Sequence, residues 1–398
     1  MRSPVSLGHE NGTIAAGNVR HYSLVTQSRG TQASSASFPP VVWPPRVRRP
    51  QRPPALVYLD LNHFICLARI AIGDTVPRGY ESLLQACRAA SSDGRAAFPL
   101  SATHYMEMSR IRDPRQRADV ADVMQELGRF LVLLGRVTIA ELEIDAMLDK
   151  LTGASTRGSA IPLLRFGFGQ AFGVVGGLVI RDGDGNDVTA AMREKVGAAE
   201  FDRNFAEANR LLERQLLAGP SDADLAELRA KGFKPDAIRR DTEQRAQQER
   251  DQAARLDADD HWRRGRLRDV ISTRELAVEW IDQITRAVIA RGTNIGDVVQ
   301  DDRTKMRAFA EGMPSSRVVI TLKTRYHRDA RHLWTVNDIH DIDALAVAVP
   351  YCDAVFTDKA ARNALSASPE IGALGTFLPR RPLDLADWVD QLPMPSTA

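Results

Sequence analysis

The sequence predicts an α/β fold with a parallel central sheet and a large helical insertion. Three apolar runs have the length of buried strands, and they begin at Leu56, Ala96 and Ala354. Runs that are continuously apolar, rather than alternating, are typical of parallel strands covered on both faces. Helical patterns follow each of these runs, as in an α/β domain.

Composition and charge narrow the class of protein. The 398 residues are 43% hydrophobic, which is normal for a globular protein, and the net charge of +2 gives no general indication of nucleic-acid binding. Three scattered cysteines (Cys66, Cys87, Cys352) lack a metal-binding spacing and favour a reducing compartment. The sequence has neither an apolar run of about 18 residues nor an apolar signal core, so we expect a cytoplasmic protein without a membrane segment.

Caps, breaks and apolar periodicity predict the individual elements. Ser101 has the position of an N-cap, and Pro314 begins a basic helix. An acid-rich segment from Asn337 starts a buried helix, which Pro350 closes. The expected helices are 63–72, 79–90, 102–108, 118–135, 141–151, most of 192–291, 314–329, 337–349, 359–365 and 382–392. The expected strands are 56–62, 96–101, 136–139, 354–357 and 375–378.

Changes in composition predict how the chain is divided. The N-terminal part is rich in Ser, Gly, Gln and Pro with a single acid, Glu10, which predicts an unstructured basic tail. A long central part is glycine-rich at first and then helical and charged, with too few apolar residues for a large core of its own. We expect it to project from the core and to mediate any self-association. The predicted parts are 1–54 (tail), 55–151 (core), 152–300 (helical insertion), 301–392 (core) and 393–398 (loose end).

Acidic residues stand at or near the ends of the predicted strands. Asp60 follows the first strand, Glu107 lies in the helix after the second, and Asp358 follows the strand at 354–357. Asp341 and Asp343 open the helix before that last strand. Sites in open α/β sheets lie at the carboxyl ends of the strands, so these carboxylates are expected to converge. Together they would repel unless a cation neutralised them, and carboxylate oxygens suit Mg²⁺ or Mn²⁺.

Ordinary structural roles account for only part of this acidic set. Asp338 is placed to cap the helix, and Asp341 then supports the helix dipole from its first turn. Asp353 has the position of a turn residue near Pro350. These roles do not explain Asp60 and Glu107.

Three segments resemble PIN-domain nucleases in their order and spacing. They are LVYLDLNHF from Leu56, PLSATHYMEMSR from Pro99, and DIDALAVAVPYCDAVFTD from Asp341. The resemblance covers about 55–150 and 300–392. It implies a three-layer α/β/α sandwich with a central parallel sheet and an acidic ribonuclease site that depends on Mg²⁺ or Mn²⁺.

The resemblance also implies roles for single residues. Asp60, Glu107 and Asp358 match acids of the family's site, and Asn62 matches its small polar residue. The remaining acid is Asp341 by its spacing from Thr357, or Asp343 by the local sequence D-A-L-A, and both stay candidates. The implied catalytic residues are Asp60, Glu107, Asp341 and Asp358, with Asp343 as a further metal ligand.

A metal-dependent endoribonuclease is therefore the expected function, with RNA as its substrate. The basic segment 303–332 would form a phosphate track beside the acids. The expected RNA contacts are Asn62, Lys323, Arg325, His327 and Arg328. Two other functions stay open: a non-catalytic nucleic-acid- or partner-binding protein on a degenerate core, and a DNA nuclease. An inhibitory partner is left open as well.

Overall fold

The computed structural model describes residues 38–395, apart from 52, 154–157, 175–178, most of 221–234, 295 and 297–301. Residues 1–37 of the predicted tail and the last three residues therefore lie outside the described chain. Of the described residues, Phe38 and 179–209 belong to a small compact unit. The larger unit comprises Pro39–Gly176 and Arg210–Ala398, and it contains every candidate site residue.

The described chain is mixed α/β and mostly helical, with a few short strands that are largely parallel. In the larger unit β2 pairs in parallel with β3 on one side and with β7 on the other. Single parallel bridges extend this sheet at both edges. One joins Leu100 to Val132 of β4, and the other joins Ala354 of β7 to Phe377. The strands are β1 Val47–Arg48, β2 Ala55–Leu59, β3 Ala96–Ala97, β4 Leu131–Leu133, β5 Ile161–Pro162, β6 Leu164–Phe166 and β7 Ala354–Phe356.

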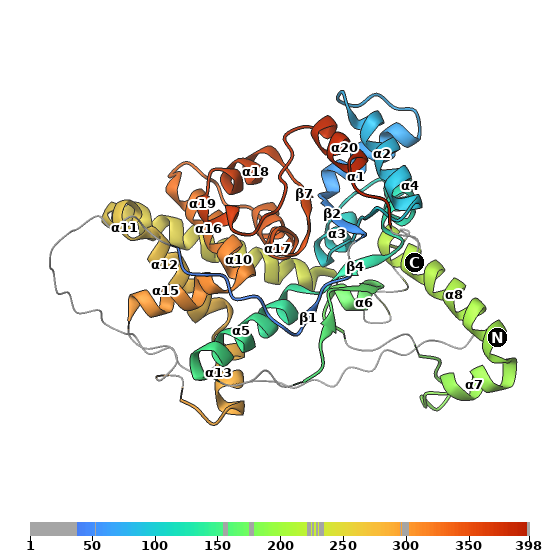
Figure 1. Cartoon of the computed structure of the whole chain (residues 1–398), viewed down its shortest axis with the longest axis horizontal. Helices are drawn as coiled ribbons and strands as arrows, with labels where there is room; N and C mark the ends of the chain where they lie inside the picture. The colour runs from blue at the N-terminus through green and yellow to red at the C-terminus, as the bar shows by residue number, and fades with distance from the viewer. Residues whose placement is uncertain are drawn as a thin grey trace. The chain divides into compact units, whose positions relative to one another are not determined.

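Helices form most of the described chain, and in the larger unit they lie on both sides of the sheet (Figure 1). Those of the first part are α1 Leu61–Ala71, α2 Tyr80–Ser92, α3 Ala102–Met108, α4 Pro114–Gly128, α5 Arg136–Thr152, α6 Phe168–Ala171, α7 Thr189–Val196 and α8 Ala198–Ala218. The central ones are α10 Pro235–Ala258, α11 Asp260–Gly265, α12 Leu267–Arg274, the π-helical turn η1 Glu275–Glu279, and α13 Ile281–Ala290. The last are α15 Arg303–Gly312, α16 Pro314–Arg328, α17 Val336–Tyr351, α18 Lys359–Ser366, α19 Pro369–Gly372 and α20 Pro382–Asp390.

Apolar residues on opposite sides of the fully buried strand β2 join two different clusters. Val57 and Leu59 pack with residues of α1, α2, α4 and α20. Leu56 and Tyr58 pack with residues of α5, α16 and α17. In Figure 1 the first group of helices lies to the upper right of β2, and α16 and α17 lie to its left. The central strand is thus covered on both sides, which explains its continuous apolar sequence.

Two sequence predictions around residue 130 are wrong. The helix expected over 118–135 ends at Gly128, because Arg129 and Phe130 adopt left-handed backbone angles (φ 51° and 57°). The apolar residues that follow form β4, which pairs antiparallel with β6. The strand expected at 136–139 is instead the first turn of α5. Short apolar runs fit a strand or a buried helix equally well, so periodicity does not separate them.

The tail prediction is wrong for residues 39–51, which lie along the larger unit. The amide of Val42 donates to the carbonyl of Gly312 (2.8 Å), and the Arg49 guanidinium donates to the carbonyl of Pro350 (2.6 Å). Between them β1 pairs in parallel with β5. Such backbone contacts hold a proline-rich segment that has little apolar surface of its own.

The central part is mostly helical, as expected, but it does not project over its second half. Helix α10 packs against α17, and α12 packs against α15 and α16. Arg245 of α10 pairs with Asp343, and Glu249 pairs with Lys323 of α16. The prediction of a projecting segment relied on its low apolar content. It is wrong for the second half, because charged residues there form ion pairs with the core instead of facing water.

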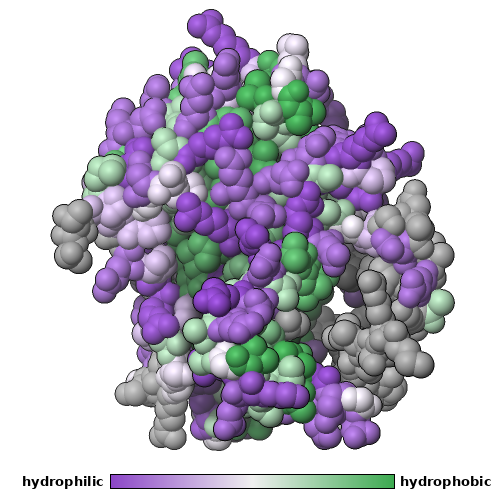
Figure 2. Space-filling view, turned by 90° about the vertical axis from the view of Figure 1, so that its right-hand side faces the viewer, coloured by the Kyte–Doolittle hydropathy of each residue, from purple (hydrophilic) through white to green (hydrophobic). Residues whose placement is uncertain are grey.

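Hydrophilic side chains dominate the face of the molecule in Figure 2, where hydrophobic ones form small separate groups. Within the described chain, no helix is both long and apolar enough to cross a membrane.

Candidate active site

Two of the candidate acids stand side by side at the carboxyl ends of neighbouring strands. Leu59 of β2 is in register with Phe356 of β7, and the Asp60 amide donates to the Phe356 carbonyl (2.9 Å). Each acid caps the helix that follows its strand. The amide of Leu61 donates to Asp60 (2.7 Å), and those of Ala360 and Ala361 donate to Asp358 (2.5 and 3.1 Å). The bonds involve one oxygen of each carboxylate, Oδ1, and they fix its orientation.

The other two acids arrive on helices. Glu107 lies in the last turn of α3, which follows β3 and packs against both α1 and α17. Asp341 lies in the second turn of α17. Among the described residues, neither carboxylate has a hydrogen bond or an ion pair. The guanidinium of Arg110 links the two helices by donating to Asn337 (2.7 Å), and its charge favours ionisation of Glu107.

Electrostatic repulsion links Asp341 to the other three carboxylates, and Asp60 to Glu107 and Asp358. Burial, then the charges of Asp60, Glu107, Asp358 and Asp338, raise the pKa of Asp341 to about 8. Burial and the charge of Asp60 raise the pKa of Glu107 to about 8. Burial raises the pKa of Asp60 to about 6, with a smaller contribution from Asp358. Partly buried acids that repel one another destabilise a fold and are typical of functional sites.

The donor set fits a hydrated divalent cation better than a fully dehydrated one. Among the described residues, no three His, Cys, Asp or Glu side chains are placed to hold one ion together. Mg²⁺ usually keeps several waters and binds directly to only one or two carboxylates. Oxygen ligands and unneutralised negative charge suit such an ion at Asp60, Glu107 and Asp341.

Asp343 does not join the acidic group, which corrects its assignment as a further ligand. It lies two residues after Asp341, and therefore on another face of α17. Arg245 donates to both of its oxygens (2.6 and 2.9 Å), and Arg136 donates to it as well. Burial alone would raise the pKa of Asp343, but these two arginines hold it below its usual value. The side chain is thus committed to a buried ion-pair network.

Two of the predicted RNA contacts, Lys323 and His327, are wrong, because both side chains are buried beside Glu249. The Lys323 side chain is only 6% exposed and lies 3.0 Å from Glu249, and His327 is buried and contacts the same carboxylate (2.8 Å). Arg325 is half-buried and donates to the Ala367 carbonyl (2.6 Å). The remaining two predicted contacts, Asn62 and Arg328, are exposed.

One residue beside the acids escaped the sequence prediction. The hydroxyl of Tyr326 on α16 lies near the acidic group, since burial and then the charges of Asp358, Asp341 and Asp338 raise its pKa. Its ring stacks on His332, with ring centroids 4.7 Å apart. Only the packing of α16 against α17 brings this tyrosine to the site, so no local sequence signal marks it.

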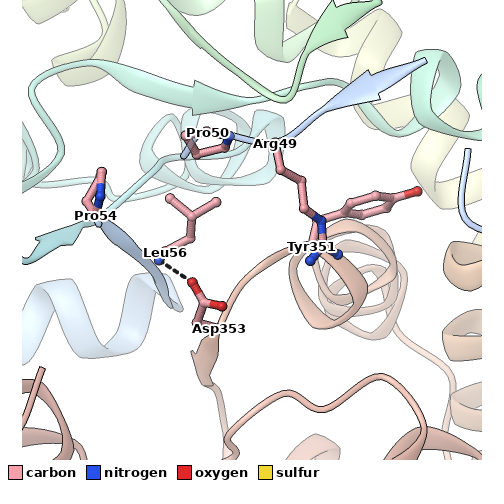
Figure 3. Close-up of a pocket in the computed structure, with 6 residues that line it drawn as sticks. All are labelled: Arg49, Pro50, Pro54, Leu56, Tyr351 and Asp353. Carbon is pink, nitrogen blue, oxygen red and sulfur yellow. Dashed lines mark hydrogen bonds between the residues drawn. The ribbon is translucent and has the colours of Figure 1, made fainter. Parts of the chain in front are cut away.

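A hollow of about 330 Å³ lies near the start of β2, away from the acidic group (Figure 3). Its lining residues are Arg49, Pro50, Pro54, Leu56, Tyr351 and Asp353. The Leu56 amide donates to Asp353 (2.8 Å), and the Arg49 guanidinium lies over the Tyr351 ring. Its charged groups are thus already engaged within the protein. The start of β2 is also the end of the strand opposite to Asp60, so this hollow is separate from the acidic group.

No protein-family model matches the chain, and neither does any curated protein or solved structure.

We expect Asp341→Asn to stabilise the metal-free protein at pH 8. The pKa of the Asp341 carboxyl group is near 4 in the unfolded chain and about 8 in the folded protein. As the pH rises from about 4 to 8, the unfolded chain loses this proton more readily than the folded protein does, so the free energy of unfolding falls. One pKa unit corresponds to about 1.4 kcal/mol, so even half of this shift makes a gain of about 3 kcal/mol in the free energy of unfolding. Urea denaturation in EDTA should show the gain at pH 8 and lose it near pH 4. An unchanged or lower stability at pH 8 would contradict the placement of Asp341.

Proposed function

We propose that this protein is a metal-dependent ribonuclease with a PIN-like core. The observation that carries the proposal is the grouping of Asp60, Glu107, Asp341 and Asp358, which come from four separate chain segments and, among the described residues, form no ion pair with a basic side chain. The two helix groups on either side of β2 support the three-layer sandwich that the PIN-like assignment requires. The order of the parallel segments across the sheet supports the same assignment. These segments are, in turn, the one at Val132, the one at Leu100, β2, β7 and the one at Phe377.

In this proposal one or two of the carboxylates of Asp60, Glu107 and Asp341 would bind Mg²⁺ or Mn²⁺ directly, and the others would bind it through its water molecules. Such an ion would supply an activated water and would neutralise charge on the phosphate. The helix-cap bonds of Asp60 and Asp358 keep their Oδ2 atoms directed away from the backbone amides. Tyr326, kept protonated by its raised pKa, offers an O–H donor to a phosphate oxygen. Arg110 supplies a positive charge at the same edge.

The direct test is cleavage of a labelled single-stranded RNA by the purified protein. We expect cleavage with Mg²⁺ or Mn²⁺ and none in EDTA. Cation binding requires ionised carboxylates, so the rate should rise between about pH 6 and 8, where Asp60, Glu107 and Asp341 titrate. Cleavage that persists in EDTA would contradict the proposal, and cleavage of DNA alone would assign the site to a DNA nuclease.

A further inference from the structure

Three hydrogen bonds fix the backbone of the loop between α16 and α17, residues 329–335. The Arg331 amide donates to the Asp329 carboxylate (3.0 Å), and the His332 amide donates to the Asp329 carbonyl (3.0 Å). At its end the carbonyl of Trp334 accepts from Arg250 (3.0 Å). These bonds define the course of the backbone from which the outer side chains project.

Three side chains in and beside this loop project into solvent. Leu333 is 83% exposed, which is the largest exposure among the large hydrophobic side chains of the described chain. The Arg331 side chain is 93% exposed, and its contact with Asp329 (3.6 Å) is too exposed to hold it firmly. Arg328, in the last turn of α16, is exposed as well. The loop and the end of α16 thus carry two exposed cations and one exposed apolar side chain.

The loop adjoins the acidic group through two contacts. His332 Nε2 lies 3.3 Å from Asp338 Oδ1, one helical turn before Asp341. The ring of His332 stacks on Tyr326, whose hydroxyl lies near Asp341 and Asp358. A polymer that reached the acids along this edge would pass the loop.

We propose that loop 329–335 binds the substrate strand of the acidic site, with Arg328 and Arg331 on backbone phosphates and Leu333 against an unpaired base. This inference rests on the proposed nuclease function and names the elements that position its substrate. Guanidinium groups pair with phosphates, and an exposed apolar side chain can pack against the face of a base that is not held in a duplex. The acids repel a polyanion, so cations beside them are needed to bring a phosphate near.

The test compares Arg331→Ala, Leu333→Ala and the double variant with wild type. Fluorescence anisotropy in EDTA measures binding of a labelled single-stranded RNA and of a matched RNA duplex. We expect the double variant to raise the Kd for the single strand by about tenfold or more. Arg331→Ala should lower the slope of log Kd against log salt by about one, whereas Leu333→Ala should leave that slope unchanged and weaken single-strand binding alone.

A matched control is Arg264→Ala with Ile289→Ala, which removes an exposed cation and an exposed apolar side chain on α11 and α13. It should bind RNA as wild type does. Equal affinity of the loop variants and wild type would overturn the inference and leave a protein partner as the occupant of the loop. Loop-dependent binding without cleavage in any divalent cation would keep the inference and reject the nuclease. Cleavage of RNA by wild type, with equal RNA binding by wild type and the loop variants, would keep the nuclease proposal and reject the role of the loop.

Discussion

Replacing Asp60 by asparagine is expected to lower the rate of RNA cleavage by about 10²–10³-fold without unfolding the protein. Loss of one preorganised electrostatic group has this typical effect. Asparagine can still accept the Leu61 amide, so the helix cap is kept while the charge is lost. The measurement is kcat at saturating Mn²⁺, together with the circular dichroism spectrum.

Asp384→Asn is the matched control. Asp384 pairs with the exposed Arg381, and it accepts the amides of Arg380 and Arg381 at the start of α20, which asparagine can still accept. Its activity should equal that of wild type. Full activity in Asp60→Asn would place the cleaving group elsewhere in the chain or in a contaminating nuclease.

Asp343→Asn is expected to lower the free energy of unfolding by about 3–5 kcal/mol, the usual cost of removing one partner of a buried ion pair. Its carboxylate is shared by Arg136 and Arg245, and the substitution leaves these two guanidiniums, whose side chains are only 12% and 26% exposed, with less negative charge beside them. Urea denaturation measures the effect.

The informative comparison is with Asp341→Asn, only two residues earlier on the same helix. At pH 8 in EDTA the two variants should change stability in opposite directions. Equal effects of the two substitutions would contradict the division of α17 into an acidic face and an ion-paired face.

The sequence predicts the sheet and its acids well where the signal is local. The continuous apolar runs at Leu56 and Ala354 are β2 and β7, and Pro314 begins α16 as expected. Asp60 and Asp358 are recognisable because each directly follows a buried strand and caps the next helix.

What the sequence could not predict depends on partners far away along the chain. Asp341 and Asp343 stand in the same helical turn, and only Arg136 and Arg245, 207 and 98 residues away from Asp343, distinguish them. From the sequence, Lys323 has the position of a solvent-facing lysine in a basic helix. In the structure it is buried beside Glu249 of α10 and Glu275 of η1. Charge pattern alone does not reveal burial when the compensating charges come from a distant segment.

The central claim is that the acidic group holds a divalent cation, and anomalous diffraction from crystals soaked in Mn²⁺ tests it most directly. We expect a manganese peak among Asp60, Glu107 and Asp341, with at least one carboxylate oxygen at about 2.0–2.6 Å and water completing the shell. We expect the peak to disappear in Asp60→Asn crystals. A soak at saturating Mn²⁺ that leaves this edge of the sheet without a peak would contradict the claim.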